Sequence, residues 1–126
     1  MEQRRILIVE DEILVSRAMQ MILTRHGAEV RVAGSAETAL SLAPQFRPEI
    51  VLCDLHLKGA YGFDLIDKFL VLLPKTTCIV VSGDTNPRVA KDAFNRNLAF
   101  LRKPFSVQEL LDCLQGDGVL PSAALS

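Results

Sequence analysis

Short runs of apolar or β-branched residues alternate along this chain with longer stretches that carry apolar side chains at helical spacing. The runs occupy residues 6–9, 29–33, 49–53, 77–81 and 99–101, and each has about the length of a typical strand. The run at residues 6–9 is apolar throughout, as in a strand that is buried on both faces. Five strand-then-helix units therefore predict an α/β domain, a parallel sheet with helices on both faces.

Residues with known capping preferences mark where the predicted helices begin and end. Gly27 suits the C-terminal end of the first helix, and Ser35 suits the N-cap of the second, which we expect to end before Pro44. Ser106 and Glu109 form a capping box at the start of the last helix. Helical spacing also places four apolar side chains on one side of the first helix: Leu14, Ala18, Met21 and Ile22. These signals do not give the order of the strands.

The size and composition of the chain fit one globular domain. It has 126 residues, 49% of them hydrophobic, and at this size a hydrophobic core suffices without disulfides or a structural metal. We expect the domain to cover residues 1–116, with Gly116 ending the last helix. Residues 117–126 are then a C-terminal tail or the remnant of a linker.

Charge and cysteine content narrow the class of protein. The net charge of −1 gives no overall field that would favour DNA, RNA or an anionic membrane. No segment approaches the ~18–20 apolar residues of a membrane span, and the N-terminus lacks the apolar stretch of a signal peptide. Cys53, Cys78 and Cys113 show no C-x-x-C spacing, which indicates core cysteines in a reducing compartment. We therefore expect a soluble cytoplasmic protein that binds neither nucleic acid nor membrane directly.

Polar side chains follow four of the five predicted strands. In an open parallel sheet, the ligand site lies beyond the carboxyl ends of the strands. The residues at these ends are an acidic cluster, a further carboxylate, a hydroxyl and an amine: Glu10, Asp11 and Glu12, then Asp54, Ser82 and Lys103. Each has an ordinary explanation on its own, as an acid at a helix start or a loop residue. Together they predict oxygen ligands for a hard divalent cation, a nucleophilic carboxylate and two groups suited to phosphoryl oxygens.

Four segments at these strand ends resemble the signature segments of bacterial response-regulator receiver domains. They read ILIVEDE at residues 6–12, PEIVLCDL at 48–55, VVSG at 80–83 and LRKPF at 101–105, in the family's order and at its spacing. The resemblance covers residues 4–115, almost the whole chain. It implies the flavodoxin-like (βα)5 fold, a doubly wound parallel sheet with strand order 2-1-3-4-5.

The resemblance also implies a role for each residue of the cluster. Asp54 resembles the phosphate acceptor. Glu10 and Asp11 resemble the acidic pair that holds Mg²⁺, joined by Asp54 and the backbone carbonyl of His56. Lys103 would pair with Asp54 at rest and with the phosphoryl group afterwards.

Further positions resemble the switch and the rim of the family's site. Ser82 would donate its hydroxyl to a phosphoryl oxygen and draw its loop inward, and Phe100 occupies the aromatic position whose ring moves inward as that loop shifts. The bond before Pro104 is typically cis in the family. His56 lies two residues beyond the acceptor and Asp84 two beyond the serine. There an imidazole could block the water that attacks the acyl phosphate, or hydrogen-bond to the carboxylate of Asp84.

Three positions depart from the family pattern. Glu10 stands where aspartate is commoner, which lengthens one metal ligand by a methylene group. Lys58 replaces a proline four residues after the acceptor, so we expect a looser loop there. Phe100 lacks the hydroxyl of a tyrosine, so its switch would work by packing alone. None of these departures removes an essential chemical group.

These implications describe a signalling receiver and not an enzyme with a substrate of its own. Such a domain takes its phosphoryl group from a sensor histidine kinase or a phosphotransfer protein, and it assists its own phosphorylation and dephosphorylation. The further partners to expect are an output domain, a downstream protein, or a second copy in a homodimer that depends on phosphorylation.

Other interpretations of the strand-end residues fit less well. An aspartyl phosphatase would need a second acid where the chain has His56, and a flavin or nucleotide binder would need a Gly- or Ser-rich loop at residues 10–12. The main alternative is a receiver-like interaction module that binds partners without phosphorylation. Four residues together argue against it: Asp11, Asp54, Ser82 and Lys103.

Overall fold

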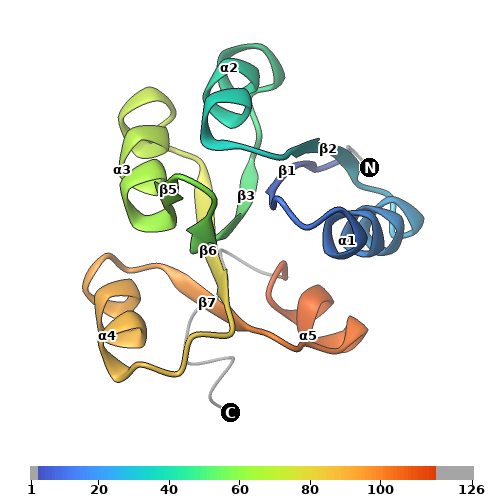
Figure 1. Cartoon of the computed structure of the whole chain (residues 1–126). Coiled ribbons are helices and arrows are strands. Elements are labelled where there is room, and N and C mark those ends of the chain that lie inside the picture. Colours follow the sequence, from blue (N-terminus) through green and yellow to red (C-terminus); the bar gives the residue numbers. More distant parts are fainter. Residues whose placement is uncertain (1–2, 116–126) are drawn as a thin grey trace.

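Figure 1 shows the computed structural model of the chain, in which residues 3–115 are described. Strands and helices alternate as predicted, with one addition, a two-stranded hairpin after the third strand. The elements in chain order are β1 (Arg5–Val9), α1 (Ile13–Arg25), β2 (Glu29–Ala33), α2 (Ala36–Phe46), β3 (Ile50–Asp54), β4 (His56–Leu57), β5 (Ala60–Tyr61), α3 (Gly62–Leu72), β6 (Thr77–Ser82), α4 (Pro87–Asn95), β7 (Ala99–Arg102) and α5 (Val107–Asp112).

Five of these strands form one parallel sheet, in the order β2-β1-β3-β6-β7. Counted within this sheet alone, the order is 2-1-3-4-5, so the predicted doubly wound, flavodoxin-like topology is confirmed. β1 pairs with β2 on one side and with β3 on the other. The strand order reverses at this point, and the crevice beyond the carboxyl ends of β1 and β3 is where such a sheet places its site.

Side chains of the sheet alternate between two hydrophobic cores. Leu7 and Val9 of β1 belong to the core shared with α2, α3 and α4, whereas Ile6 and Ile8 belong to the core shared with α1 and α5. The helices therefore cover the two faces of the sheet in these two groups, as Figure 1 shows. Because all four side chains are buried, the strand that leads into the acidic cluster is firmly held.

The buried side of α1 agrees with the side that sequence spacing suggested only at Ile22, which is partly buried against the core. Met19 and Leu23 are buried against the sheet, whereas the side chain of Leu14 is 83% exposed and that of Met21 is 54% exposed. Apolar residues occur on several sides of this helix, so spacing alone does not select one of them. The rotation of α1 about its axis depends on how the chain leaves β1, which a sequence pattern does not encode.

Helix α2 continues through Pro44, so the predicted end before this proline is wrong. In the last turn of a helix, proline removes only one intrahelical hydrogen bond. The helix ends at its cap, Arg47, which has a left-handed φ of 51° and donates its N–H to the carbonyl of Ala43. Phe46 packs against the core next to α2, which favours the extra turn.

Other predicted helix ends are confirmed. Gly27, with a φ of 90°, follows the cap of α1. Ser35 caps α2 through its side-chain oxygen, which accepts a backbone N–H. The capping box of Ser106 and Glu109 is complete at the start of α5. These contacts form within one helical turn, which is why the local sequence predicts them.

The last helix is shorter than predicted. α5 ends at Asp112, and turn-type backbone hydrogen bonds continue the chain to Gln115. Gly116, the predicted end, and the predicted tail at residues 117–126 lie outside the described residues. Within residues 3–115, none of the helices is both long enough and apolar enough to cross a membrane.

The three cysteines are free and buried, as predicted. Burial raises the pKa of the Cys78 and Cys113 thiols to about 12, and it also raises the pKa of Cys53. Such thiols stay protonated near neutral pH. They therefore act as small apolar side chains of the core.

The added hairpin turns the chain back onto the end of β3. β4 pairs antiparallel with β5, and Gly59 has a left-handed φ of 74° between them. α3 begins immediately afterwards at Gly62, whose N–H donates to the carbonyl of Leu55. A Cβ atom at residue 62 would lie 2.7 Å from the carbonyl oxygen of Asp54. The hairpin can close onto β3 because this residue has no side chain.

Candidate functional site

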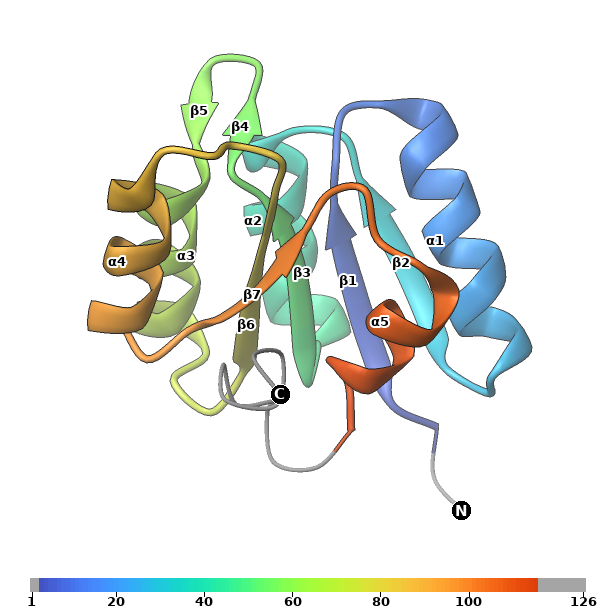
Figure 2. The ribbon, with the colours of Figure 1, turned by 90° about the horizontal axis from the view of Figure 1, so that it is seen from below.

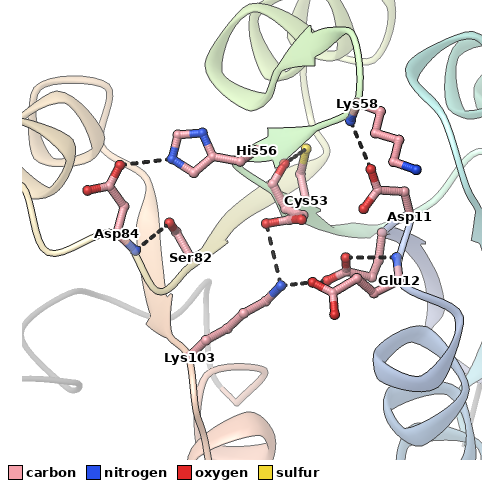
Figure 3. Close-up of polar contacts among 10 residues, drawn as sticks. Asp11, Glu12, Cys53, His56, Lys58, Ser82, Asp84 and Lys103 are labelled. Carbon is pink, nitrogen blue, oxygen red and sulfur yellow. Dashed lines mark hydrogen bonds and ion pairs between the residues drawn. The ribbon is translucent and has the colours of Figure 1, made fainter.

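The carboxyl ends of the parallel strands lie along one edge of the sheet (Figure 2). Glu10 and Asp11 follow β1, Asp54 ends β3, Ser82 ends β6, and Lys103 follows β7. Figure 3 shows the polar contacts among these strand ends and the neighbouring loops. The structure thus brings the sequence-predicted cluster to one edge, as the parallel topology requires.

Three carboxylates form the centre of this cluster. Side-chain oxygens of Glu10, Asp11 and Asp54 all lie within 4.8 Å of one another. Glu10 is only 3% exposed and Asp54 only 7% exposed. Like charges held this close and shielded from water repel strongly unless a cation faces them.

Lys103 provides a positive charge for two of these carboxylates. Its Nζ donates a hydrogen bond of 2.8 Å to Oε1 of Glu10 and lies 3.5 Å from Oδ1 of Asp54. The predicted ion pair with Asp54 is therefore present, but the shorter contact goes to Glu10. Sequence reasoning gave Glu10 a role toward the metal only and missed this partner.

The pKa values of this pair are shifted by burial and by each other. Burial raises the pKa of Glu10, the hydrogen bond from Lys103 opposes this, and the charge of Asp54 raises the pKa further, with a net increase. For Lys103, burial lowers the pKa, but the hydrogen bond to Glu10 and the charge of Asp54 outweigh it, so its pKa is raised. Lys103 is therefore firmly protonated at neutral pH.

Asp11 is held by the loop that follows β3. Its Oδ2 accepts the backbone N–H of Lys58 at 2.8 Å (Figure 3). A proline at residue 58 would have no N–H to donate. This hydrogen bond and the β4–β5 hairpin hold the segment, so they argue against the looser loop expected from the sequence.

A chain of hydrogen bonds links the loop after β6 to β4. Ser82, which is buried, accepts the N–H of Asp84 through Oγ. Oδ1 of Asp84 accepts the N–H of Asn86, and Oδ2 lies 2.8 Å from Nε2 of His56. The hydrogen bond from Asn86 has the larger effect in lowering the pKa of Asp84, and the contact with His56 lowers it further. The hydrogen bond between His56 and Asp84 that the sequence suggested is therefore present. The block on attacking water by the imidazole and the binding of a metal ion by the backbone carbonyl of His56 stay predictions.

The last predicted positions lie on and after β7. The ring of Phe100 is half-buried against the core of α2, α3 and α4, and the guanidinium carbon of Arg102 lies 5.3 Å from its centroid. The predicted cis bond between Lys103 and Pro104 is confirmed. The switch role of Phe100 stays a prediction.

The donor set fits a hard divalent cation. Mg²⁺ is bound in proteins by a few carboxylates together with waters, and it prefers oxygen ligands. The three clustered carboxylates offer such oxygens at compatible separations. The amine of Lys103 contacts two of these carboxylates, and the hydroxyl of Ser82 is at the end of the neighbouring strand β6. Both kinds of group hold phosphoryl oxygens in phosphoryl transfer.

Residues 6–115 match the family described as the response regulator receiver domain, and this range includes nearly all the described residues. The chain belongs to this family. It is thus a receiver domain of the kind used in two-component signalling.

Relatives and solved structures agree with this assignment. The receiver domain is 32% identical to the nitrogen assimilation regulatory protein NtrX of Azorhizobium caulinodans over 109 residues, which is 84% of this chain and 24% of NtrX. A response regulator receiver domain protein from Methanospirillum hungatei is 28% identical, with a TM-score of 0.81, over 87% of this chain and 89% of that one. A Burkholderia pseudomallei response regulator is 27% identical, with a TM-score of 0.84, over 98% of this chain and 70% of that one.

The receiver domain corresponds to only part of several curated relatives. It spans 24% of the length of NtrX and 53% of the length of the transcriptional regulatory protein FixJ of Rhizobium meliloti. Its relatives therefore combine such a domain with further sequence.

Proposed function

We propose that this receiver domain accepts a phosphoryl group on Asp54 in a Mg²⁺-dependent reaction, and that phosphorylation changes which partners it binds. The supporting observation is the environment of Asp54, a buried carboxylate that lies within 4.8 Å of two acids and 3.5 Å from a lysine amine. The donor would be a sensor histidine kinase or a phosphotransfer protein, as befits two-component signalling.

The residues around Asp54 divide the work of the transfer. A carboxylate oxygen of Asp54 forms the bond to phosphorus while the bond to the donor breaks on the opposite side, and the donor keeps the bonding electrons. The ammonium of Lys103 neutralises charge on the phosphoryl oxygens. Ser82 turns its hydroxyl from the N–H of Asp84 toward a phosphoryl oxygen, which moves the loop after β6. The half-buried ring of Phe100 then follows that loop.

Glu10, Asp11 and Asp54 are the side chains that would hold Mg²⁺, with the backbone carbonyl of His56 as a further ligand. When bound, the cation stabilises the negative charge that develops on the transferring group. The hydrogen bond from Lys58 to Asp11 orients one of these ligands.

A solved relative supports the proposal. The Burkholderia pseudomallei response regulator was crystallised with a phosphorylated aspartic acid and a calcium ion. That structure shares the fold of this chain at 27% identity. Both parts of the proposal, an acyl phosphate on aspartate and a divalent cation, occur together there.

A small phosphodonor distinguishes this proposal from an interaction module that works without phosphorylation. In the presence of acetyl phosphate and Mg²⁺, we expect the intact mass of the protein to increase by one phosphoryl group. Chelation of the cation with EDTA should prevent the increase, because the three acids then lack their neutralising ion. A mass that stays unchanged with Mg²⁺ present would support the interaction module.

The hydrogen bond between His56 and Asp84 should control how long the phosphoryl group persists. It joins β4 to the loop after β6 at the rim of the site (Figure 3), where we expect the attacking water to approach. Because the orientation of a nucleophile strongly affects its rate, we expect His56→Ala or Asp84→Ala to change the half-life about threefold or more without preventing phosphorylation. The measurement is the decay of phosphorylated protein in Mg²⁺ after removal of the donor.

His26 provides the matched control for this measurement. It is an exposed histidine at the C-cap of α1, and its Nδ1 contacts the carbonyl of Ile22. His26→Ala should leave the half-life unchanged. If both rim variants also decayed within twofold of the wild type, the rim contact would have no part in dephosphorylation.

A further inference from the structure

The longer side chain at residue 10 reaches the lysine of the site. Oε1 of Glu10 accepts the hydrogen bond from Nζ of Lys103 at 2.8 Å. Oε2 accepts the backbone N–H of Glu12 at 3.2 Å. Both oxygens of this buried carboxylate are therefore already engaged within the protein.

The ammonium of Lys103 acts as a resident cation among the carboxylates. It contacts two of the three acids that would hold a metal ion, Glu10 and Asp54. A buried carboxylate is costly unless a positive charge faces it, and the side chain of Lys103 is only 22% exposed, so water screens this pair weakly. A divalent cation that binds the same oxygens must displace the ammonium, because two cations on one carboxylate repel each other.

We propose that Lys103 competes with the divalent cation for Glu10, so that binding of the cation breaks the hydrogen bond between Nζ of Lys103 and Oε1 of Glu10. This inference rests on the proposed function, in which the same acids hold Mg²⁺. Glu10 then acts as a positioning residue. It holds the lysine amine at its own carboxylate until the cation is bound, and the released amine is then free to pair with the phosphoryl group on Asp54.

Glu10→Asp separates this role from that of a simple ligand. Aspartate keeps the charge but is shorter by one C–C bond, about 1.5 Å, so it no longer reaches Lys103 at hydrogen-bonding distance. If Glu10 were only a ligand placed for the cation, shortening it would weaken Mg²⁺ binding. If it also holds the competing ammonium, shortening it strengthens binding, and we expect an increase in affinity of about threefold or more.

Isothermal titration calorimetry with Mg²⁺, on the unphosphorylated protein at fixed pH, tests the proposal. Lys103→Met removes the ammonium but keeps most of the side-chain volume, and we expect it to raise the affinity about tenfold. The double variant with Glu10→Asp should match Lys103→Met within about twofold, because both substitutions remove the same contact.

Lys68→Met is the matched control for the loss of a positive charge. It removes the amine of an exposed lysine on α3 that has no part in the site. Its effect should stay below about threefold, since the amine of an exposed lysine is screened by water and salt.

The outcomes separate this inference from the metal site itself. Saturable Mg²⁺ binding that Asp11→Ala abolishes would support the site whatever happens at residue 10. If Mg²⁺ binds, an affinity of Glu10→Asp equal to or weaker than that of the wild type would overturn this inference but not the metal site. The same holds if the effects of Glu10→Asp and Lys103→Met on affinity multiply in the double variant. No Mg²⁺ binding by the wild type or any variant would overturn both. Urea unfolding checks each fold, and Glu10→Asp decides the matter even if Lys103→Met does not fold.

Discussion

Asp54→Asn is expected to abolish phosphorylation by acetyl phosphate in Mg²⁺. The amide has nearly the size of the carboxylate but lacks the anionic oxygen that attacks phosphorus. Removal of one charge from the acidic cluster also leaves the fold intact, because it relieves repulsion among three close carboxylates. Intact-mass spectrometry measures the result, and the wild type should gain one phosphoryl group under the same conditions.

Asp67→Asn is a suitable control for this substitution. Asp67 lies on α3 and pairs with Arg96, away from the strand ends. Its loss should leave the phosphoryl gain unchanged, since only an exposed ion pair is affected. Undiminished labelling of Asp54→Asn would place the acceptor at another residue and refute the assignment.

Gly62→Ala is expected to destabilise the protein severely, by about 3 kcal/mol or more. A Cβ atom at this position would lie 2.7 Å from the carbonyl oxygen of Asp54 and 2.7 Å from the Cα of Leu55. Both are backbone atoms at the end of the central strand, so neither can move without disturbing β3 or the start of α3. The midpoint and slope of urea unfolding measure the loss.

Gly34→Ala provides the comparison for this effect. No atom lies within 4 Å of a Cβ built at Gly34, and its φ is outside the left-handed region. This substitution should be neutral or slightly stabilising, because alanine reduces the entropy of the unfolded chain. Equal unfolding midpoints for Gly62→Ala and Gly34→Ala would show that the close approach of residue 62 to β3 is not required.

The sequence by itself determined which residues form the five strands of the main sheet and where most helices begin and end. The run at residues 6–9 forms a strand because a segment that is apolar on both faces is best buried inside a parallel sheet. Ser35 and Ser106 begin helices as predicted, because a cap bonds to N–H groups within its own first turn. The meeting of Asp54 and Lys103 at one edge follows from parallel strand direction, once family resemblance supplies the strand order.

Only the tertiary structure decided the contacts between distant segments. It turned Met19 toward the sheet instead of Leu14, and it gave Lys103 a closer partner in Glu10, 93 positions away, than in Asp54. It also joined His56 to Asp84. Such contacts depend on the rotation and spacing of whole elements and differ from their alternatives by about 1 kcal/mol. Local patterns of apolar and polar residues do not encode differences of that kind.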